Sequence, residues 1–339
     1  MRGTRRWTLA RYPEGKLAES DFALAADAGE TPLLQLGEVL VRNRMFAVAP
    51  TIRNWLRPGS TSQRAAIAIG GTIRGMAACE VIASAHPGYA VGTRMIAMSE
   101  WADFSVIRPD LAPVPVFMVP EGMDFAQAMG PLSLNSLTAY FGLLKVGRPR
   151  AGETVVVSGA AGSVGSTVCQ IASITGCRVI GIAGGASKCA RVMSVGKAEA
   201  AIDYRADDVR QRLRELCPNG IDIFFDNVGG DQLRAAVDCM APHGRIIVCG
   251  QISTYDQGCP SDTGLDMMKV VYGRLRIEGF VVGDYVDCAD EARRQLDAWV
   301  RAGALEVALD MRSGLDQLPR ALIDLLGGAN TGTLLVVND

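Results

Sequence analysis

The residues best suited to chemistry form a glycine-rich turn in the middle of the chain, from Ser158 to Gly165. Its spacing is Gly159-x-x-Gly162-x-x-Gly165, and bare glycines let backbone N–H groups approach an anion closely. The apolar run at 154–157 predicts a buried strand before the turn, and the apolar spacing after it predicts a helix. A strand, a glycine turn and a helix in this order predict a pyrophosphate site, with a tight corner that binds nothing as the alternative.

The second predicted strand, Arg178–Ala183, indicates which dinucleotide fits. NAD sites carry an Asp or Glu at the end of this strand to hold the ribose 2′-hydroxyl, whereas small residues and a cation accommodate a 2′-phosphate. No acidic residue stands between the strand and Lys188, which favours NADPH. Lys188, with Tyr204 or Arg205, is the candidate partner of the phosphate. An ordinary solvated helix residue is the alternative interpretation of Lys188.

Metal and hydrolytic chemistry lack the residues that they need. The whole chain has two histidines, His86 and His243, and its nine cysteines contain no C-x-x-C pair. A zinc alcohol dehydrogenase site needs converging thiolate and imidazole ligands. The sequence contains no G-x-S-x-G motif, so nothing in it indicates a serine hydrolase. We therefore expect no catalytic metal, with His86 in a turn and His243 in a loop.

Reduction without a metal must rely on hydride placement and on hydrogen-bond donors that stabilise an enolate oxygen. This chemistry suits a conjugated double bond. Hydride would enter at the β-carbon of an α,β-unsaturated ketone or aldehyde, and the α-carbon would take a proton from a tyrosine, the cofactor ribose or water. The sequence therefore predicts an NADPH-dependent reductase of enones or enals.

A parallel sheet has to position these residues. From residue 126 onward strand-like and helix-like segments alternate, which is typical of βαβ units. The predicted strands are 154–158, 178–183, 221–226, 244–249 and 275–282. The predicted helices are 164–175, 188–195, 209–216, 232–240 and 289–301.

The first part of the chain has a different pattern, with short β-like runs such as 38–42 and 78–82 broken by Gly and Pro. The final apolar run, 334–337, is a strand without a following helix, and its return to the first domain would make the cofactor domain an insertion. The predicted fold is α/β: a Rossmann doubly wound parallel sheet, residues 126–308, inserted into a mainly β, GroES-like catalytic domain of residues 1–125 and 309–339.

Composition restricts the partners. The chain is 49% hydrophobic and 21% charged with a formal net charge of −2, which indicates a globular protein without the basic field that attracts nucleic acid or anionic lipid. The uncharged stretch 154–177 contains too many Gly, Ser and Thr residues for a membrane span. No export signal precedes the first strands. We expect a cytoplasmic protein without nucleic-acid or membrane partners.

The chain resembles, nearly end to end, the zinc-independent medium-chain reductases of the leukotriene B4 dehydrogenase, prostaglandin reductase, alkenal double-bond reductase and curcumin reductase group. The segments that carry the resemblance are 7–15, 137–143, 152–162 and 225–230. The family's pattern implies NADPH, a homodimer and an enone or enal substrate. The cofactor residues that it implies are Gly162, Ser163, Val164 and Gly165 at the pyrophosphate, Lys188 and Tyr204 at the 2′-phosphate, Asn227 at the nicotinamide half, Cys249, Gly250, Ile252, Ser253 and Tyr255 in a loop over the cofactor, Phe280, Val281 and Val282 beside the nicotinamide, and Asn330 closing the site.

Two hydroxyl groups, those of Tyr255 and Tyr285, are the candidates for orienting the substrate carbonyl. Loop aromatics without a role are the alternative for both, a buried strand is the alternative for 280–282, and a turn residue is the alternative for Asn227.

Two departures from the family fall where substrates are chosen. Ala-Pro-Thr-Ile-Arg at 49–53 replaces the family's Asp-Pro-Tyr or Asp-Pro-Ala before Met-Arg, so a substrate tyrosine is absent there. The segment 258–264 replaces a proline-rich loop of some members. The particular substrate is therefore not inherited. A quinone reductase and a non-catalytic NADPH-binding structural or sensing protein are the rival hypotheses.

Overall fold

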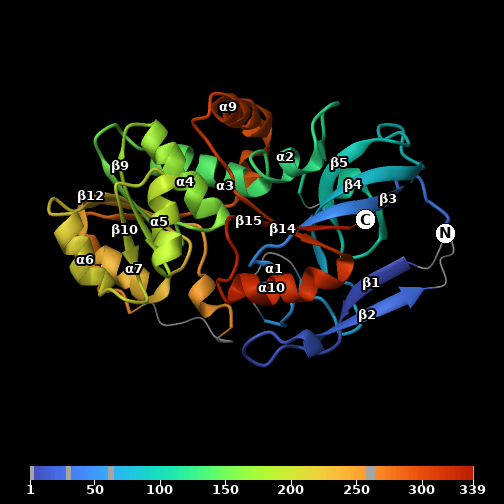
Figure 1. The fold of residues 1–339 in the computed structure, drawn as a ribbon, viewed down its shortest axis with the longest axis horizontal. Helices are drawn as coiled ribbons and strands as arrows, with labels where there is room; N and C mark the ends of the chain where they lie inside the picture. Colours follow the sequence, from blue (N-terminus) through green and yellow to red (C-terminus); the bar gives the residue numbers. More distant parts are fainter. Residues whose placement is uncertain (1–3, 28–31, 60–64, 113, 257–263, 339) are drawn as a thin grey trace. The chain divides into compact units, whose positions relative to one another are not determined.

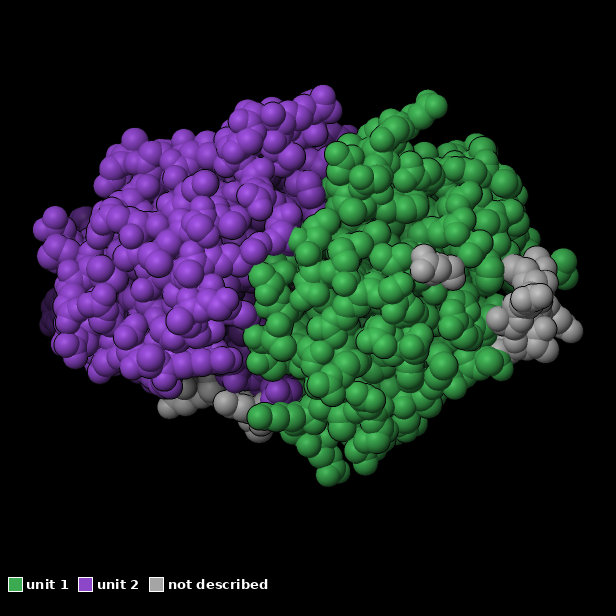
Figure 2. Space-filling model, in the orientation of Figure 1, with its two compact units in different colours: residues 1–129, 309–339 green, residues 130–308 purple. Residues whose placement is uncertain are grey.

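The computed structural model describes residues 4–27, 32–59, 65–112, 114–256 and 264–338. The chain divides into two compact units, with Met1–Met129 and Leu309–Asp339 in unit 1 and Gly130–Ala308 in unit 2 (Figures 1 and 2). Unit 2 is therefore an insertion in the sequence of unit 1. The first boundary lies at Met129, a short way beyond the predicted residue 125.

Unit 2 is built on a six-stranded sheet in the order β10-β9-β8-β11-β12-β13, in which every pair is parallel. This is the strand order of doubly wound dinucleotide-binding sheets. The strands are β8 Thr154–Ser158, β9 Arg178–Ala183, β10 Ala200–Asp203, β11 Ile221–Asp226, β12 Met240–Val248 and β13 Arg276–Gly279. The helices are α3 Leu134–Phe141, α4 Ser163–Ile174, α5 Ala186–Ser194, α6 Val209–Leu216, α7 Gly230–Val237, α8 Met267–Gly273 and α9 Ala289–Arg301, with a π-helical turn η3 Gly142–Gly147 and the 3-10 helices η4 Ile252–Thr254 and η5 Val282–Cys288. The predicted fold class is confirmed.

The two faces of this sheet carry different helices, because successive side chains of a strand point to opposite faces. On one face Val156 of β8 and Phe224 of β11 pack with Leu213 of α6 and with α7. On the other face α5 approaches Gly181 of β9, and the π-helical turn approaches Phe225 of β11. Both faces are thus covered, which explains why these strands are continuous apolar runs.

Several sequence predictions in unit 2 are wrong in detail, and one of them is the helix predicted at 232–240, which ends at Val237. The strand predicted at 244–249 begins at Met240, and its pairing with β11 shifts register between Ile221 and Ile223. His243, predicted in a loop, lies inside this strand with a φ of 66°, and the irregular pairing accommodates that conformation. The strand predicted at 275–282 ends at Gly279, so the segment 280–282 follows the sheet rather than belonging to it.

Unit 1 contains a seven-stranded sheet in the order β14-β15-β3-β4-β5-β7, with β6 also paired to β3, and a separate β1–β2 hairpin. Its strands are β1 Thr4–Leu9, β2 Phe22–Asp27, β3 Val39–Ala47, β4 Arg74–Ser84, β5 Arg94–Glu100, β6 Phe104–Ile107, β7 Phe117–Met118, β14 Leu309–Ser313 and β15 Thr333–Val337. The helices are α1 Ile52–Trp55, α2 Phe125–Met129 and α10 Leu318–Leu326, with the 3-10 helices η1 Glu19–Asp21, η2 Pro109–Leu111 and η6 Leu315–Gln317. The last strand, β15, pairs antiparallel with β3 and so joins the two sequence segments of the unit.

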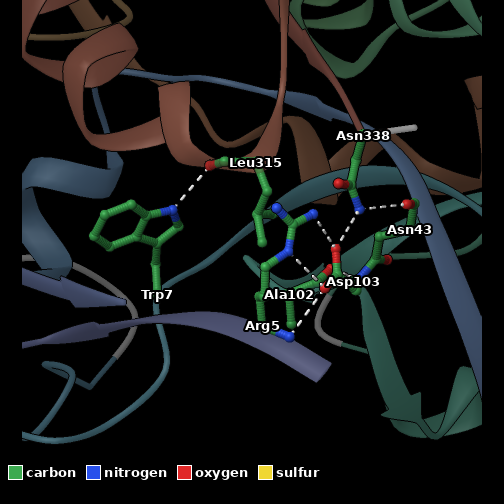
Figure 3. A network of polar contacts seen from close by, with 7 residues as sticks. All are labelled: Arg5, Trp7, Asn43, Ala102, Asp103, Leu315 and Asn338. Carbon is green, nitrogen blue, oxygen red and sulfur yellow. Dashed lines mark hydrogen bonds and ion pairs between the residues drawn. The ribbon is translucent and has the colours of Figure 1, made fainter. Parts of the chain in front are cut away.

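A polar network holds the N-terminal strand of unit 1 to the strands around it (Figure 3). Arg5 donates from its backbone N and from Nε and Nη2 to the Asp103 carboxylate at 2.9 to 3.0 Å. Asn338, near the C-terminus, donates from Nδ2 to Asp103 Oδ1 at 3.3 Å and to the Asn43 carbonyl at 3.0 Å. Hydrogen bonds from Arg5 lower the pKa of Asp103, although partial burial alone would raise it. The network therefore stabilises the charged carboxylate.

Candidate functional site

The predicted site residues of unit 2 gather at one edge of its sheet. Because all six strands are parallel, the segments that follow them lie at the same, carboxyl, edge. The segments in question are 159–165 after β8, 184–188 after β9, 204–205 after β10, 227–230 after β11, 249–255 after β12 and 280–282 after β13. In open α/β sheets this edge is where ligands bind.

The glycine turn directs the start of α4 toward this edge. Gly159 has a φ of 60°, and its carbonyl accepts from the Gly162 N–H at 3.0 Å. Gly162 is the N-cap of α4 with extended backbone, and it brings no side chain to the helix end. The first N–H groups of a helix, here those beginning at Ser163 and Val164, have no carbonyl partner within the helix and lie at the positive end of its dipole. The turn has the geometry of an anion-binding site.

Close packing explains the third glycine of the motif. A Cβ on Gly165 would lie 2.3 Å from the Gly159 carbonyl oxygen and 2.9 Å from Ala160 Cα. Gly181 of β9 is similar, because its Cβ would lie 2.3 Å from Val192 Cγ1 on α5. These glycines let helices and turn approach the sheet more closely than any side chain would allow.

Asn135 on α3 contacts the predicted pyrophosphate site, and the sequence patterns did not indicate this contact. Its side-chain Nδ2 donates to Ser163 Oγ at 3.0 Å, which ties the first residue of α4 to α3. The residue pattern at 134–141 did not lead to a predicted helix. The sequence feature that could have predicted the start of this helix is its N-cap Ser133, whose hydroxyl accepts from the Ser136 N–H.

The ends of β9 and β10 bring two cations together. The pKa of Lys188 is lowered by burial and by the nearby charge of Arg205. The Arg205 guanidinium lies 5.9 Å from the centre of the Tyr204 ring. That ring covers Gly184, where a Cβ would come within 2.8 Å of it. Two cations and a tyrosine beside a bare glycine suit a phosphate group.

The Asp203 carboxylate lies close to these cations, but its hydrogen bonds are to backbone N–H groups. Its Oδ1 accepts from the N–H of Gly185 at 2.8 Å and from the N–H of Arg205 at 3.0 Å. These hydrogen bonds, the one from Gly185 first, lower the pKa of Asp203. The carboxylate therefore shapes the turn after β9 and stays ionised.

The turn after β11 is bonded to the strand that carries the glycine turn. Asn227 donates from Nδ2 to the Ser158 carbonyl at 2.7 Å and from its backbone N to Ser158 Oγ at 2.8 Å. The neighbouring Asp226 is fully buried, and its Oδ1 accepts from the Ser158 hydroxyl at 2.7 Å and from the Gly229 N–H at 2.9 Å. Burial raises the pKa of Asp226. These bonds set the orientation of the Asn227 amide.

The segment after β12 folds over the Asn227 turn. The Ser253 N–H and hydroxyl both donate to the Val228 carbonyl, at 3.1 and 2.6 Å. A Cβ on Gly250 would lie 3.7 Å from the Tyr255 hydroxyl, so this hydroxyl stays beside the same segment. Burial raises the pKa of the Cys249 thiol to about 12, which excludes a reactive thiolate at neutral pH. Ile252 begins η4 within this segment.

The segment after β13 packs on the end of α3. The Phe280 ring lies against Gly142 and Phe225, and the Tyr285 ring stacks on Phe141 with ring centres 4.9 Å apart. Val281 is 39% exposed, so 280–282 is no buried strand. The structure thus brings Phe280 and Tyr285 to one helix end.

The remaining predicted site features belong to unit 1 or fall outside the described residues. Asn330 is buried in unit 1 and donates from Nδ2 to the Gly332 carbonyl at 3.0 Å. In the altered segment 49–53, Arg53 is buried and donates to the Gly15 carbonyl at 2.7 Å. Most of the altered segment 258–264 lies outside the described residues.

The described ranges contain neither a metal-ligating cluster nor a helix that could span a membrane. Within them, no three or more His, Cys, Asp or Glu side chains form a group that could hold a metal ion. No described helix has both the length and the apolar character needed to cross a membrane.

Two protein families match the chain. The family described as "N-terminal domain of oxidoreductase" matches residues 5–113, and the family described as "Zinc-binding dehydrogenase" matches residues 163–299. Together they cover more than half of the chain.

Curated relatives match it almost end to end. The NADPH-dependent curcumin reductase of Escherichia coli is 34% identical over 337 residues, 98% of this chain and 96% of that protein. Prostaglandin reductase 1 of Bos taurus is 33% identical over 332 residues, 97% and 98% of the two chains. The crystal structure of CurA from Vibrio vulnificus in complex with NADPH is 31% identical, with a TM-score of 0.90 over 99% of both chains.

Proposed function

The chain belongs to the enone and alkenal double-bond reductases of the medium-chain dehydrogenase/reductase family, and from this premise we propose a reaction. The protein reduces the C=C bond of α,β-unsaturated ketones or aldehydes with NADPH and without a metal. The arrangement at the carboxyl edge of the unit 2 sheet carries the proposal. There an anion-binding helix start, a pair of cations and the Asn227 turn follow successive strands.

NADPH fits these residues. The start of α4 at Ser163 suits the pyrophosphate, and Lys188 with Arg205 and Tyr204 suits the 2′-phosphate. The fixed Asn227 amide suits the nicotinamide half. Bound NADPH supplies the hydride that enters at the β-carbon of the substrate.

The hydroxyl groups of Tyr255 and Tyr285 are proposed to orient the substrate carbonyl. A phenol donates a hydrogen bond to an oxygen that gains negative charge during reduction, which stabilises the enolate. Tyr255 belongs to the segment that follows β12, where its hydroxyl lies near Gly250, and Tyr285 belongs to the 3-10 helix η5.

The activity is tested by following NADPH absorbance with an alkenal, a long-chain enone and a quinone. We expect turnover of the alkenal or the enone. Turnover of the quinone alone would identify a quinone reductase instead. Tight NADPH binding without turnover of the whole panel would identify a binding protein. Loss of activity on treatment with a zinc chelator would contradict the metal-free reaction.

The cofactor assignment is tested by Lys188→Ala. Loss of a charge-assisted contact worth about 1.5 to 3 kcal/mol weakens NADPH binding by roughly one to two orders of magnitude and leaves NADH binding nearly unchanged. Arg191→Ala is the matched control, because it removes a charge from the same helix one turn farther on. An equal loss for both cofactors, or an equal effect of the control, would contradict the role of Lys188.

A homodimer is part of the proposal, through β13 of unit 2. Among the described residues this edge strand pairs only with β12, and Ile277 within it is 40% exposed. Antiparallel pairing with a second copy about Ile277 sets Arg276 opposite Glu278, which is favourable for opposite charges. Ile277→Lys should give monomers in analytical ultracentrifugation. Met311→Lys is the control, because Met311 is similarly exposed, at 45%, on β14, an edge strand of the seven-stranded sheet of unit 1.

Monomers from the control alone would refute the choice of β13. A monomeric unaltered protein would refute the dimer itself.

A cytoplasmic location is also proposed, and it agrees with the absence of disulfide bonds among the eight cysteines in the described residues.

A further inference from the structure

The end of α3 has an unusual backbone. The α-helix Leu134–Phe141 continues into the π-helical turn Gly142–Gly147, which ends at Arg148 with a φ of 50°. Single π-helical turns are rare in α-helices and occur often at functional sites. The turn lies on the sheet face that carries Phe225, and Gly142 within it lies next to Phe280 of the segment that follows β13.

Gly142 is the residue on which Phe280 rests. A Cβ at Gly142 would lie 2.5 Å from Phe280 Cζ, 2.8 Å from Phe280 Cε1 and 2.8 Å from Phe225 Cε2. Real Cβ atoms do not come this close to other heavy atoms, so the two rings occupy the space that a side chain would need. Phe225 is fully buried, and its ring meets Phe280 edge to face with centres 6.4 Å apart.

Phe141, the preceding residue, holds the next aromatic of the same segment. It is almost fully buried, and its ring stacks on Tyr285 with 11° between the ring planes. Tyr140 meets the Phe141 ring edge to face and also contacts Trp299 of α9. Two consecutive residues, the last of α3 with its aromatic ring and the first of the π-helical turn without a side chain, therefore anchor both ends of the segment 280–285.

We propose that Phe141 and Gly142 are positioning residues that set where Phe280 lies against the nicotinamide and where Tyr285 lies against the substrate carbonyl. The inference rests on the proposed function, which assigns those contacts to Phe280 and Tyr285. Phe141 and Gly142 act through these two side chains and touch no reactant themselves.

The direction of the effect follows from the packing. An alanine at Gly142 cannot push the Phe280 ring toward Phe225, because Phe225 is part of the core. The ring must move toward its exposed side, where the nicotinamide is proposed to bind. Hydride transfer is sensitive to misplacement on the order of 1 Å, so such a shift slows turnover.

Gly142→Ala tests the inference by comparing two ligands. NADPH carries the nicotinamide, whereas 2′,5′-ADP carries only the adenine and phosphate half. We expect the variant to bind NADPH roughly tenfold more weakly and to bind 2′,5′-ADP as the unaltered protein does. In turnover with the best enone or enal, the kinetic isotope effect of deuterated NADPH should rise, because hydride transfer becomes slower.

A second substitution and a control make this result specific. Phe280→Leu in the Gly142→Ala background removes the two Phe280 ring atoms that clash and leaves only the Phe225 contact, so the double variant should bind NADPH more tightly than Gly142→Ala does. A Cβ at Gly147 in the same π-helical turn would meet the flexible end of the Ile247 side chain at 3.1 Å and two other atoms at ordinary contact distances of 3.5 and 3.6 Å, so Gly147→Ala should leave binding and turnover unchanged. Equal binding of NADPH by Gly142→Ala and by the unaltered protein would overturn the inference. An equal loss of both ligands, or no rescue by Phe280→Leu, would also overturn it.

Phe141→Leu tests the second contact independently if Gly142→Ala does not fold. It keeps apolar bulk but removes the ring that stacks on Tyr285. KM for the enone should rise several-fold while the Kd of NADPH stays constant. An unchanged KM would refute this half of the proposal. If the unaltered protein reduces no enone or enal, the proposed function fails, whereas the comparison of NADPH with 2′,5′-ADP still decides the role of Gly142.

Discussion

Replacing Gly165 with alanine sets two physical effects against each other. Alanine in the interior of a helix is favoured over glycine by about 1 kcal/mol, because the unfolded glycine chain loses more entropy on folding. Gly165 lies in the first turn of α4, so helix propensity alone predicts a more stable protein. The packing of the glycine turn predicts the opposite.

The steric effect should be larger. The new Cβ would lie 2.3 Å from the Gly159 carbonyl oxygen, whereas carbon–oxygen contacts are normally about 3.3 Å or longer. The turn and the helix must therefore separate by about 1 Å. Overpacking costs about 1 to 3 kcal/mol when side chains can rearrange. Here the opposing atoms belong to the backbone of Gly159 and Ala160, which cannot rotate away, so we expect the upper part of that range.

The net change is then a loss of about 1 to 2 kcal/mol in the free energy of unfolding, together with a large loss of NADPH affinity. Urea denaturation followed by fluorescence measures the first quantity, and NADPH titration measures the second. Ser166→Ala, at the next position of the same helix, is the control and should change both only slightly, because its hydroxyl makes one long bond of 3.4 Å. Stability and affinity of Gly165→Ala at or above the original values would refute the close-approach argument.

Three further substitutions test other parts of the structure. Burial raises the pKa of Asp226 above its value in the unfolded chain, so this carboxyl destabilises the folded protein increasingly as pH rises above about 4, the ordinary pKa of Asp. The stability of Asp226→Asn relative to the original protein should therefore grow as pH rises through this region, and a constant difference would contradict this. Asp103→Ala should lower the free energy of unfolding by about 1 to 3 kcal/mol at pH 7 through loss of the Arg5 contacts. Because the pKa of Asp103 is lowered, this loss of stability should shrink as pH falls, and denaturation at several pH values measures both its size and its pH dependence. Gly184→Ala should displace the Tyr204 ring and weaken NADPH more than NADH, which cofactor titrations would detect and an equal effect would disprove.

Local patterns were sufficient to predict most of the cofactor unit. The strands Thr154–Ser158, Arg178–Ala183 and Ile221–Asp226 and the helices Val209–Leu216 and Ala289–Arg301 have the predicted bounds. Strands buried on both faces are continuous apolar runs, and glycines mark their ends, so this information is contained in neighbouring residues. The NADPH prediction was local as well, because it depended on the residues that directly follow the second strand.

Contacts between distant residues were decided only by the tertiary structure. Pairing with Ile221–Asp226 extends β12 back to Met240 and so places His243 in a strand, although its own sequence resembles a turn. The contact between Asn135 and Ser163 joins two helices, one of which has no strong local signal.

The site itself combines both kinds of information. The sequence determined which residues follow each strand, since residue types and their spacing along the chain are enough for that. The tertiary structure decided how these residues are held: Gly142 makes room for the Phe280 ring, and Phe141 stacks on Tyr285, across more than 100 residues of intervening chain. Packing depends on the shape of both partners, and no local pattern contains the shape of a partner that lies so far away in sequence.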